Sequence, residues 1–340
     1  MRKFLIKCLF TVLPLWMMWV GLTCYISLVV IPRCSGDLGE LALIPFGKAY
    51  DQALSQQVMT DTFYTTFHDE DEVRSGKVDV LTVGDSFSQL GNTGYQNYLK
   101  LKNVDIANFA RYYLFNPVQK VADLLRFGYV DSTNVKLIML EVGERRLAEH
   151  FGAVTFHNQS MTRAPRKTVV KGNGKWSLSR ARDYLYYGLN INDINPVLTA
   201  SLDRDFFSSA EPRKLYFYRD EIDLGVSISQ REAMMIKEKL EELNALAKEN
   251  GVELMMIVPP DKYDVYQGYI INNPYPRKTI IGDLERWIGD CPHIVLLKES
   301  IMPLVAEGEK DVYLFNDTHW SFKAQKAATE QIYKRLPELK

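Results

Sequence analysis

The stretch from Val78 to Ser88 constrains the fold of this chain more than any other. It begins as a short apolar run, which is typical of a strand buried inside a parallel sheet. It ends in Gly84-Asp85-Ser86, and glycine tolerates tight backbone angles while aspartate and serine cap helices well. These residues predict a sharp turn at the carboxyl end of a strand, where open α/β sheets bind ligands. Ser86 would present its hydroxyl there, although an ordinary turn between a strand and a helix has the same residues.

Further apolar runs predict strands at 104–108, 135–142, 252–258 and 294–297. Helices are expected at 117–127, 229–250, 283–288 and 322–336. This alternation favours an α/β fold in which helices cover both faces of a parallel sheet. Residues 151–228 interrupt the alternation, and we interpret them as an insertion with short elements of its own. A substrate lid, a partner surface and mere decoration all remain open for this insertion.

The N-terminal region predicts a membrane anchor. No charged residue lies between Cys8 and Ile31, and this run of 24 residues is long enough to cross a bilayer as a helix. Arg2, Lys3 and Lys7 precede it, so the positive-inside rule places the N-terminus in the cytoplasm and the chain after residue 35 outside. A cleaved signal peptide is the alternative, but the apolar run is long for one and no small-residue cleavage site is evident.

The chain of 340 residues thus divides into three predicted parts. Residues 1–35 form the anchor with a short cytoplasmic tip, residues 36–76 a surface connector, and residues 77–340 one catalytic domain. The net charge of −1 argues against nucleic acid as a partner. No Cys/His cluster has the spacing of a zinc site, so we predict no metal. Whether Cys34 and Cys291 pair stays open.

A second candidate motif, Asp317-Thr318-His319-Trp320, follows the last predicted strand. It should therefore lie at the same rim of the sheet as Ser86. An aspartate two residues before a histidine lies on the same side of an extended segment, so Asp317 can orient His319. The other imidazole nitrogen would then face Ser86, which needs such a base to become a nucleophile. Trp320 would form part of the wall of the site. A loop with a surface histidine is the alternative.

Together these motifs resemble the SGNH (GDSL-type) esterases and acetyltransferases. The closer likeness is to the alginate O-acetyltransferase branch of periplasmic SGNH-like proteins, over about residues 77 to 336 apart from the insertion. Four short motifs carry it, in the same order as in that branch. They are Gly84-Asp85-Ser86-Phe87, Glu144-Arg145, Pro259-Pro260-Asp261-Lys262-Tyr263 and Asp317-Thr318-His319-Trp320.

The resemblance implies a flavodoxin-like three-layer α/β/α sandwich with a parallel sheet, preceded by one transmembrane helix. It implies O-acetylation of an extracytoplasmic polysaccharide, with Ser86 as nucleophile, His319 as base and Asp317 as its orienting group. No cofactor is expected. Because acetyl-CoA does not reach the periplasm, a membrane-bound O-acyltransferase would supply the acetyl group. The chain would be a single-pass protein of the inner membrane, with its catalytic domain in the periplasm.

The chain departs from typical SGNH esterases in its oxyanion-binding residues. Their Gly-x-Asn-Asp block is replaced here by Glu144-Arg145, so the oxyanion hole cannot be carried over intact. The Ser86 backbone N–H is still a candidate donor, and we expect Arg145, Glu144 and Asp85 to support the site. A buried ion pair between Glu144 and Arg145 that only fixes the loop is equally compatible with the sequence.

Substrate contacts are harder to assign. Trp320, Tyr113, Lys262 and Tyr263 are candidates for contact with a glycan, although packing explains each aromatic ring equally well. Two other functions remain open. The same triad would serve an esterase that removes acetyl groups, and a non-catalytic glycan-binding or assembly component would keep the fold without the chemistry.

Overall fold

A six-stranded parallel sheet forms the centre of the computed structural model, which describes residues 2–58, 61–110, 116–131, 133–156, 178–189 and 194–336. The strands are β1 (Thr65–Phe67), β2 (Val80–Val83), β3 (Ile106–Phe109), β4 (Leu137–Glu141), β7 (Glu253–Val258) and β8 (Ile294–Leu296). Their order is β1-β3-β2-β4-β7-β8. From β3 to β8 this is the flavodoxin-like order, which reverses direction beside β2. The crevice between the ends of β2 and β4 is therefore the expected ligand site.

Helices cover both faces of this sheet and form two cores. Successive strand residues point to opposite faces, so Val80 lies in one core and Leu81 in the other. The first core is closed by α5 (Tyr95–Leu101), α11 (Lys262–Tyr266), α13 (Lys298–Ala306) and α14 (Phe322–Arg335). The second is closed by α4 (Glu70–Ser75), α6 (Pro117–Arg126), α7 (Leu147–Ala153), α10 (Gln230–Glu249) and α12 (Ile280–Ile288). The predicted three-layer α/β/α sandwich is confirmed.

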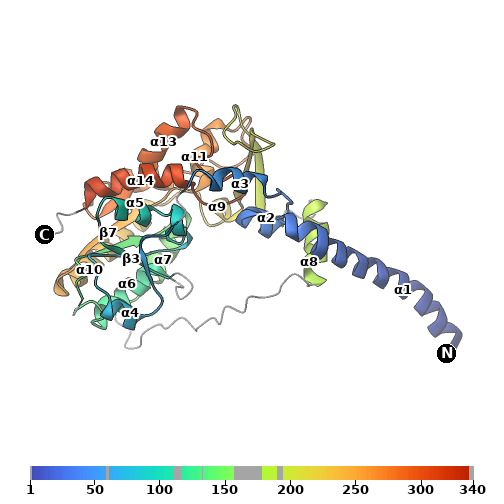
Figure 1. Cartoon of the computed structure of the whole chain (residues 1–340), viewed down its shortest axis with the longest axis horizontal. Helices are drawn as coiled ribbons and strands as arrows, with labels where there is room; N and C mark the ends of the chain where they lie inside the picture. Colours follow the sequence, from blue (N-terminus) through green and yellow to red (C-terminus); the bar gives the residue numbers. More distant parts are fainter. Residues whose placement is uncertain are drawn as a thin grey trace.

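The N-terminal helix α1 (Arg2–Tyr25) projects away from this body (Figure 1). It continues through the π-helical turn η1 (Ile26–Val30) and the 3₁₀ turn η2 (Ile31–Arg33). Residues Phe10–Arg33 are long and apolar enough to cross a membrane. Helix α8 (Leu178–Gly188) lies beside the end of α1 nearest the body (Figure 1).

Residues 36–76 are part of the folded domain, and their prediction as a surface connector was wrong. They form α2 (Gly36–Ala42), α3 (Ala49–Ser55), the sheet strand β1 and helix α4. Leu38 and Tyr50 are buried in the first core. The segment directly after the anchor therefore packs against the sheet domain instead of leading to it.

The predicted insertion at 151–228 contains short elements, as expected. Among its described residues are α8, the antiparallel hairpin of β5 (Val197–Ser201) and β6 (Lys214–Tyr218), and α9 (Asp220–Asp223). Within the described part of the chain no disulfide joins Cys34 to Cys291, which lie in different cores.

Candidate active site

The Gly84-Asp85-Ser86 turn follows β2 at the carboxyl rim, as predicted, and leads into a 3₁₀ turn at Ser86–Ser88. Asp85 holds this turn in place, because its carboxylate accepts hydrogen bonds from the backbone N–H of Phe87 (2.9 Å) and of Gly143 (3.0 Å). The turn after β2 is thereby tied to the loop after β4. Ser86 is half-buried at the start of this turn.

Glycine is required at position 84 for space and not for its backbone angles. The φ angle of Gly84 is not positive, so other residues could adopt its backbone conformation. A Cβ atom there would lie 2.4 Å from the Ser88 Oγ and 2.5 Å from the Glu141 Oε2. Both contacts are too short for any side chain, so a larger residue would push the turn away from the end of β4.

Glu141, the last residue of β4, lies buried directly behind this turn. Its Oε2 accepts hydrogen bonds from the Asp85 backbone N–H (3.0 Å) and the Ser88 hydroxyl (2.9 Å). Burial, and then the nearby Asp85 carboxylate, raise the pKa of Glu141 well above its ordinary range. A buried carboxyl group therefore supports the nucleophile turn from below, and the sequence analysis assigned it no role.

The second half of the site is the loop before α14, where Asp317 and His319 meet as predicted. The Asp317 Oδ1 lies 2.5 Å from the His319 Nδ1 and also accepts from the His319 backbone N–H at 3.0 Å. Burial raises the pKa of Asp317, but the hydrogen bond and the charge of His319 outweigh it and lower the value to about 2. Asp317 is therefore an anion that fixes which way the imidazole faces.

His319 is a buried base whose outer nitrogen lacks a hydrogen-bond partner among the described residues. The residue is only 5% exposed, and Nε2 is fully enclosed. The imidazole packs edge-on against Phe87, with ring centroids 5.0 Å apart, and Phe87 directly follows Ser86 in the chain. No hydrogen bond joins Ser86 to His319 in this part of the structure, and such contacts are often loose before substrate binds.

A cleft of about 360 Å³ opens over these two loops. Its wall comes from seven parts of the fold, including α2, α7 and the end of β6. It is lined by Asp37, Leu41, Gly84, Asp85, Ser86, Pro117, Arg145, Arg146, His150, Tyr218 and Thr318. Ser86 therefore opens onto the same cavity as Thr318, the residue between Asp317 and His319.

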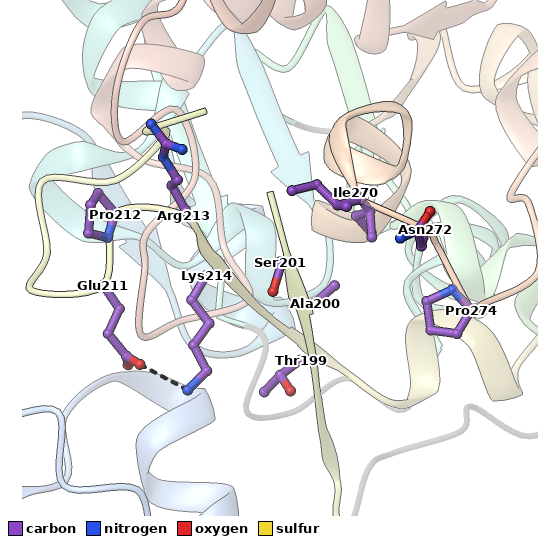
Figure 2. Close-up of a pocket in the computed structure, with 11 residues that line it drawn as sticks. Thr199, Ala200, Ser201, Glu211, Pro212, Arg213, Lys214, Ile270, Asn272 and Pro274 are labelled. Atoms are coloured by element: carbon purple, nitrogen blue, oxygen red, sulfur yellow. Dashed lines mark hydrogen bonds and ion pairs between the residues drawn. The ribbon is translucent and has the colours of Figure 1, made fainter. Parts of the chain in front are cut away.

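Larger hollows exist, but they lack this chemistry. One of about 570 Å³ lies on the β5–β6 hairpin, where Glu211 and Lys214 form an ion pair at 2.9 Å (Figure 2). Another of about 630 Å³ lies between α5 and α14. Neither lining contains Ser86 or Thr318, which both line the smaller cleft. The smaller cleft is therefore the candidate site, because size alone does not identify a catalytic centre.

Arg145 and Glu144 do not pair with each other in the structure; both hold the turn at Asp261 instead. The Arg145 guanidinium pairs with the Asp261 carboxylate, and Glu144 Oε2 accepts from the Asp261 backbone N–H at 2.8 Å. Burial lowers the pKa of Arg145, but the carboxylates of Asp261 and Glu221 outweigh it and raise the pKa above its ordinary range. Arg145 is thus a permanent cation in the cleft wall, and Glu144 is a buried brace beneath it.

Three of the four predicted glycan contacts are buried and leave no surface for a ligand. Trp320 packs against Phe87, and the Tyr263 hydroxyl donates to the Pro276 carbonyl. The Lys262 ammonium group donates to three backbone carbonyls of the Asp317 loop. Burial lowers the pKa of Lys262 to about 7. These three residues support the site from within, and Tyr113 lies outside the described residues.

Several residues of the site were not predicted. Asp37 contacts the Asp317–His319 pair, and His150 and Tyr218 line the cleft. Burial lowers the pKa of His150. Glu221 of α9 accepts from the Thr318 hydroxyl at 2.9 Å and from the Tyr263 backbone N–H at 2.7 Å. Part of the predicted insertion therefore braces the loop that contains Asp317 and His319, which no local sequence pattern indicated.

Residues 215–340 match the family model described as the SGNH hydrolase-like domain of acetyltransferase AlgX. A comparison with curated proteins finds no match. The matched segment contains the Asp317–His319 loop and the Asp261 turn, and the Gly84-Asp85-Ser86 turn precedes it. This match supports the resemblance seen in the motifs: over residues 215–340 the chain is similar to the SGNH hydrolase-like domain of acetyltransferase AlgX.

Proposed function

We propose that this protein transfers acetyl groups to a polysaccharide outside the cytoplasm through an acetyl-serine intermediate. The observation that carries the proposal is the Asp317–His319 pair, which holds an unpartnered Nε2 beside the Ser86 turn. An imidazole with one nitrogen fixed by a carboxylate and the other free to accept a proton is the arrangement that activates a serine hydroxyl.

The reaction proceeds in two halves. In the first, His319 Nε2 takes the Ser86 proton while the Ser86 Oγ attacks the acetyl carbonyl, and the proton then passes to the departing group of the donor. In the second, a sugar hydroxyl gives its proton to His319 and attacks the acetyl-serine carbonyl. The bond from that carbonyl to the Ser86 Oγ then breaks, and His319 returns the proton to Oγ, which leaves the sugar ester and a restored Ser86. The Ser86 backbone N–H is our candidate for the oxyanion donor, and Arg145 adds positive charge to the cleft.

The donor and the location follow from the anchor. The helix at Phe10–Arg33, with Arg2, Lys3 and Lys7 at its start, favours a single-pass protein whose domain faces the periplasm. Acetyl-CoA is a cytoplasmic donor, so we propose that a membrane-bound O-acyltransferase passes the acetyl group across the bilayer to Ser86. The anchor would keep the two proteins together.

Replacing Ser86 with alanine tests the proposal. In the wild type, a labelled acetyl ester should leave an acetyl group on Ser86 that mass spectrometry detects, and acetylated polymer should form in cells. Ser86→Ala should abolish both, and His319→Ala should lose nearly as much because members of a triad act as a unit. Full polymer acetylation in cells that carry Ser86→Ala would instead indicate a non-catalytic glycan-binding or assembly component. A wild type that releases free acetate and no acetylated glycan would be an esterase.

A further inference from the structure

The segment that leaves the membrane helix contacts the catalytic loop directly. The Asp37 backbone N–H donates to the Asp317 Oδ2 at 3.0 Å, and the Leu38 backbone N–H donates to the Asn316 carbonyl at 3.1 Å. The Asp37 carboxylate lies 3.5 Å from the His319 Nδ1. Positions 37 and 317 are far apart in the chain, so folding brings the end of the anchor to the base of the active site.

Gly36 allows this close approach. Its φ is +70°, which disfavours other residues, and a Cβ atom there would lie 2.2 Å from the Asn316 carbonyl oxygen. The Asn316 side chain also donates to the Ser35 hydroxyl and to Asp51, both at 2.8 Å. The contact is therefore a packed interface with its own hydrogen bonds, and a larger residue at position 36 would separate its two sides.

We propose that the anchor-exit segment, Ser35 to Leu38, is part of the active site, with Asp37 as a positioning residue for the Asp317–His319 pair. This inference rests on the function proposed above and deepens it. The Asp37 N–H occupies one oxygen of Asp317, which leaves Oδ1 to hold the His319 imidazole. The Asp37 carboxylate adds a second negative charge beside the imidazole, and this charge favours the cation that forms when His319 holds the Ser86 proton.

The same segment limits how far the site lies from the membrane. The membrane-spanning stretch ends at Arg33, four residues before Asp37. Four residues of extended chain reach about 14 Å at most. Asp37 and Leu41 of α2 also line the cleft that contains Ser86. The cleft therefore opens close to the bilayer surface, where a donor protein embedded in the membrane can present an acetyl group.

Two glycines make a matched test in the full chain in detergent micelles. Gly36 and Gly47 both have positive φ, so alanine strains the backbone similarly at each position. Only Gly36→Ala pushes against Asn316, because nothing lies within 4 Å of a Cβ at Gly47. Gly36→Ala should lower kcat for an acetyl ester about tenfold or more with little change in KM, since small misplacements of catalytic groups have large effects. Gly47→Ala should stay within about twofold of the wild type.

A readout without turnover separates this inference from the proposed reaction. The proton between His319 Nδ1 and Asp317 should give a far-downfield resonance in histidine-labelled protein. Gly36→Ala should shift or broaden it, and Gly47→Ala should not. If both variants match the wild type in kcat and in this resonance, the inference is wrong even where turnover requires Ser86. If the resonance responds but Ser86→Ala changes no turnover, the positioning contact stands and the proposed reaction falls.

Asp37→Asn guards against misfolding of Gly36→Ala, because it keeps the backbone N–H and removes only the charge. Asp37 is 54% exposed at its side chain, so water screens it, and we expect kcat to fall only about two- to fivefold. KM and the melting temperature should not change. An unchanged kcat in Asp37→Asn together with an unchanged resonance in Gly36→Ala would overturn the proposal.

Discussion

At the scale of single residues, Glu141 shows how the nucleophile turn is held. Its side chain is fully buried and receives hydrogen bonds from Asp85 and Ser88, on either side of Ser86. Burying a carboxylate without a positive partner is unfavourable, so the group holds its proton more tightly in the folded chain than in the unfolded one. The raised pKa thus favours the neutral acid, and in that form Glu141 braces the turn through hydrogen bonds.

This reading predicts different outcomes for two substitutions of Glu141. Glutamine keeps the shape and one acceptor oxygen, so the free energy of unfolding of Glu141→Gln should lie within about 1 kcal/mol of the wild-type value. Alanine leaves the Asp85 N–H and the Ser88 hydroxyl unpaired beside a cavity. The free energy of unfolding of Glu141→Ala should therefore be about 2–4 kcal/mol lower than that of the wild type. Denaturant unfolding of the full chain in micelles measures both. A glutamine variant as unstable as the alanine variant would contradict the neutral-acid assignment.

The same residue predicts a pH dependence. The folded pKa of Glu141 is raised, so its stabilising contribution is complete below the unfolded value of about 4.3 and declines as pH rises through the folded value. Glu141→Gln cannot titrate and lacks this decline. The stability of the wild type relative to Glu141→Gln should therefore be larger at about pH 5 than at about pH 8. A difference that stays constant, or grows with pH, would contradict the raised pKa.

Residues that act through their own short motif could be predicted from the sequence, and residues that arrive from elsewhere could not. The Asp317–His319 contact follows from a spacing of two in an extended loop. Asp37 and Glu221 reach the same loop from distant parts of the chain, and neither belongs to a local motif that points to this loop. Burial also reversed the roles expected for Lys262 and Tyr263, because a polar side chain in a turn gives no sign of which way it points.

At the scale of elements, α11 and the Asp317 loop are joined by one lysine. The Lys262 Nζ donates to the carbonyls of Leu314 (2.7 Å), Phe315 (3.0 Å) and Asp317 (3.0 Å). Lys262 follows β7, while the three acceptors precede α14, so this side chain links two rim loops of the sheet. The loop that holds the base is thereby fixed to the scaffold independently of any contact with substrate.

Lys262→Met should therefore loosen the loop more than the fold. Methionine fills similar space but leaves three carbonyls without their donor, and each unmade bond of this kind weakens the loop by about 1 kcal/mol or more. We expect faster amide hydrogen exchange in residues 313–319 and a kcat lowered about tenfold or more, because the base is no longer held in place. Lys323→Met is the control, since Lys323 bonds to Glu309 and Lys310 outside this loop. Equal effects in the two variants would contradict the assignment.

The elements that could be predicted are those with strong local signals. The helix expected at 229–250 is α10, which begins with a capping box between Ser229 and Glu232, and the one expected at 117–127 is α6, which starts at Pro117. Strand β1 was missed because it has three residues and no apolar run, Thr-Thr-Phe. Its place in the sheet depends on pairing with β3, which is a tertiary contact.

At the scale of the whole molecule, the anchor and the catalytic domain meet at α2. Helix α1 projects from the body and contacts α8 and η1, whereas α2 packs against the β5–β6 hairpin (Figure 1). No residue from the described part of α1 lines the cleft, whereas α2 contributes Asp37 and Leu41. We therefore expect separable roles for these two parts, with α1 as the membrane anchor and α2 as a support for the Asp317–His319 pair.

Two truncations separate these roles. A chain of residues 31–340, exported with a cleavable signal, keeps Ser35, Gly36 and Asp37 and should turn over a soluble acetyl ester within about twofold of the full chain. It should acetylate little polymer in cells, because it is no longer held beside a donor in the membrane.

A chain of residues 49–340 loses α2 as well, and with it the Asp37 bond to Asp317 and the Leu38 bond to Asn316. It should lose ester turnover while circular dichroism still shows the helices and strands of the sheet domain. Ester turnover equal in both fragments would mean that α2 is not part of the site, and full polymer acetylation by residues 31–340 would mean that the donor does not need a tethered acceptor.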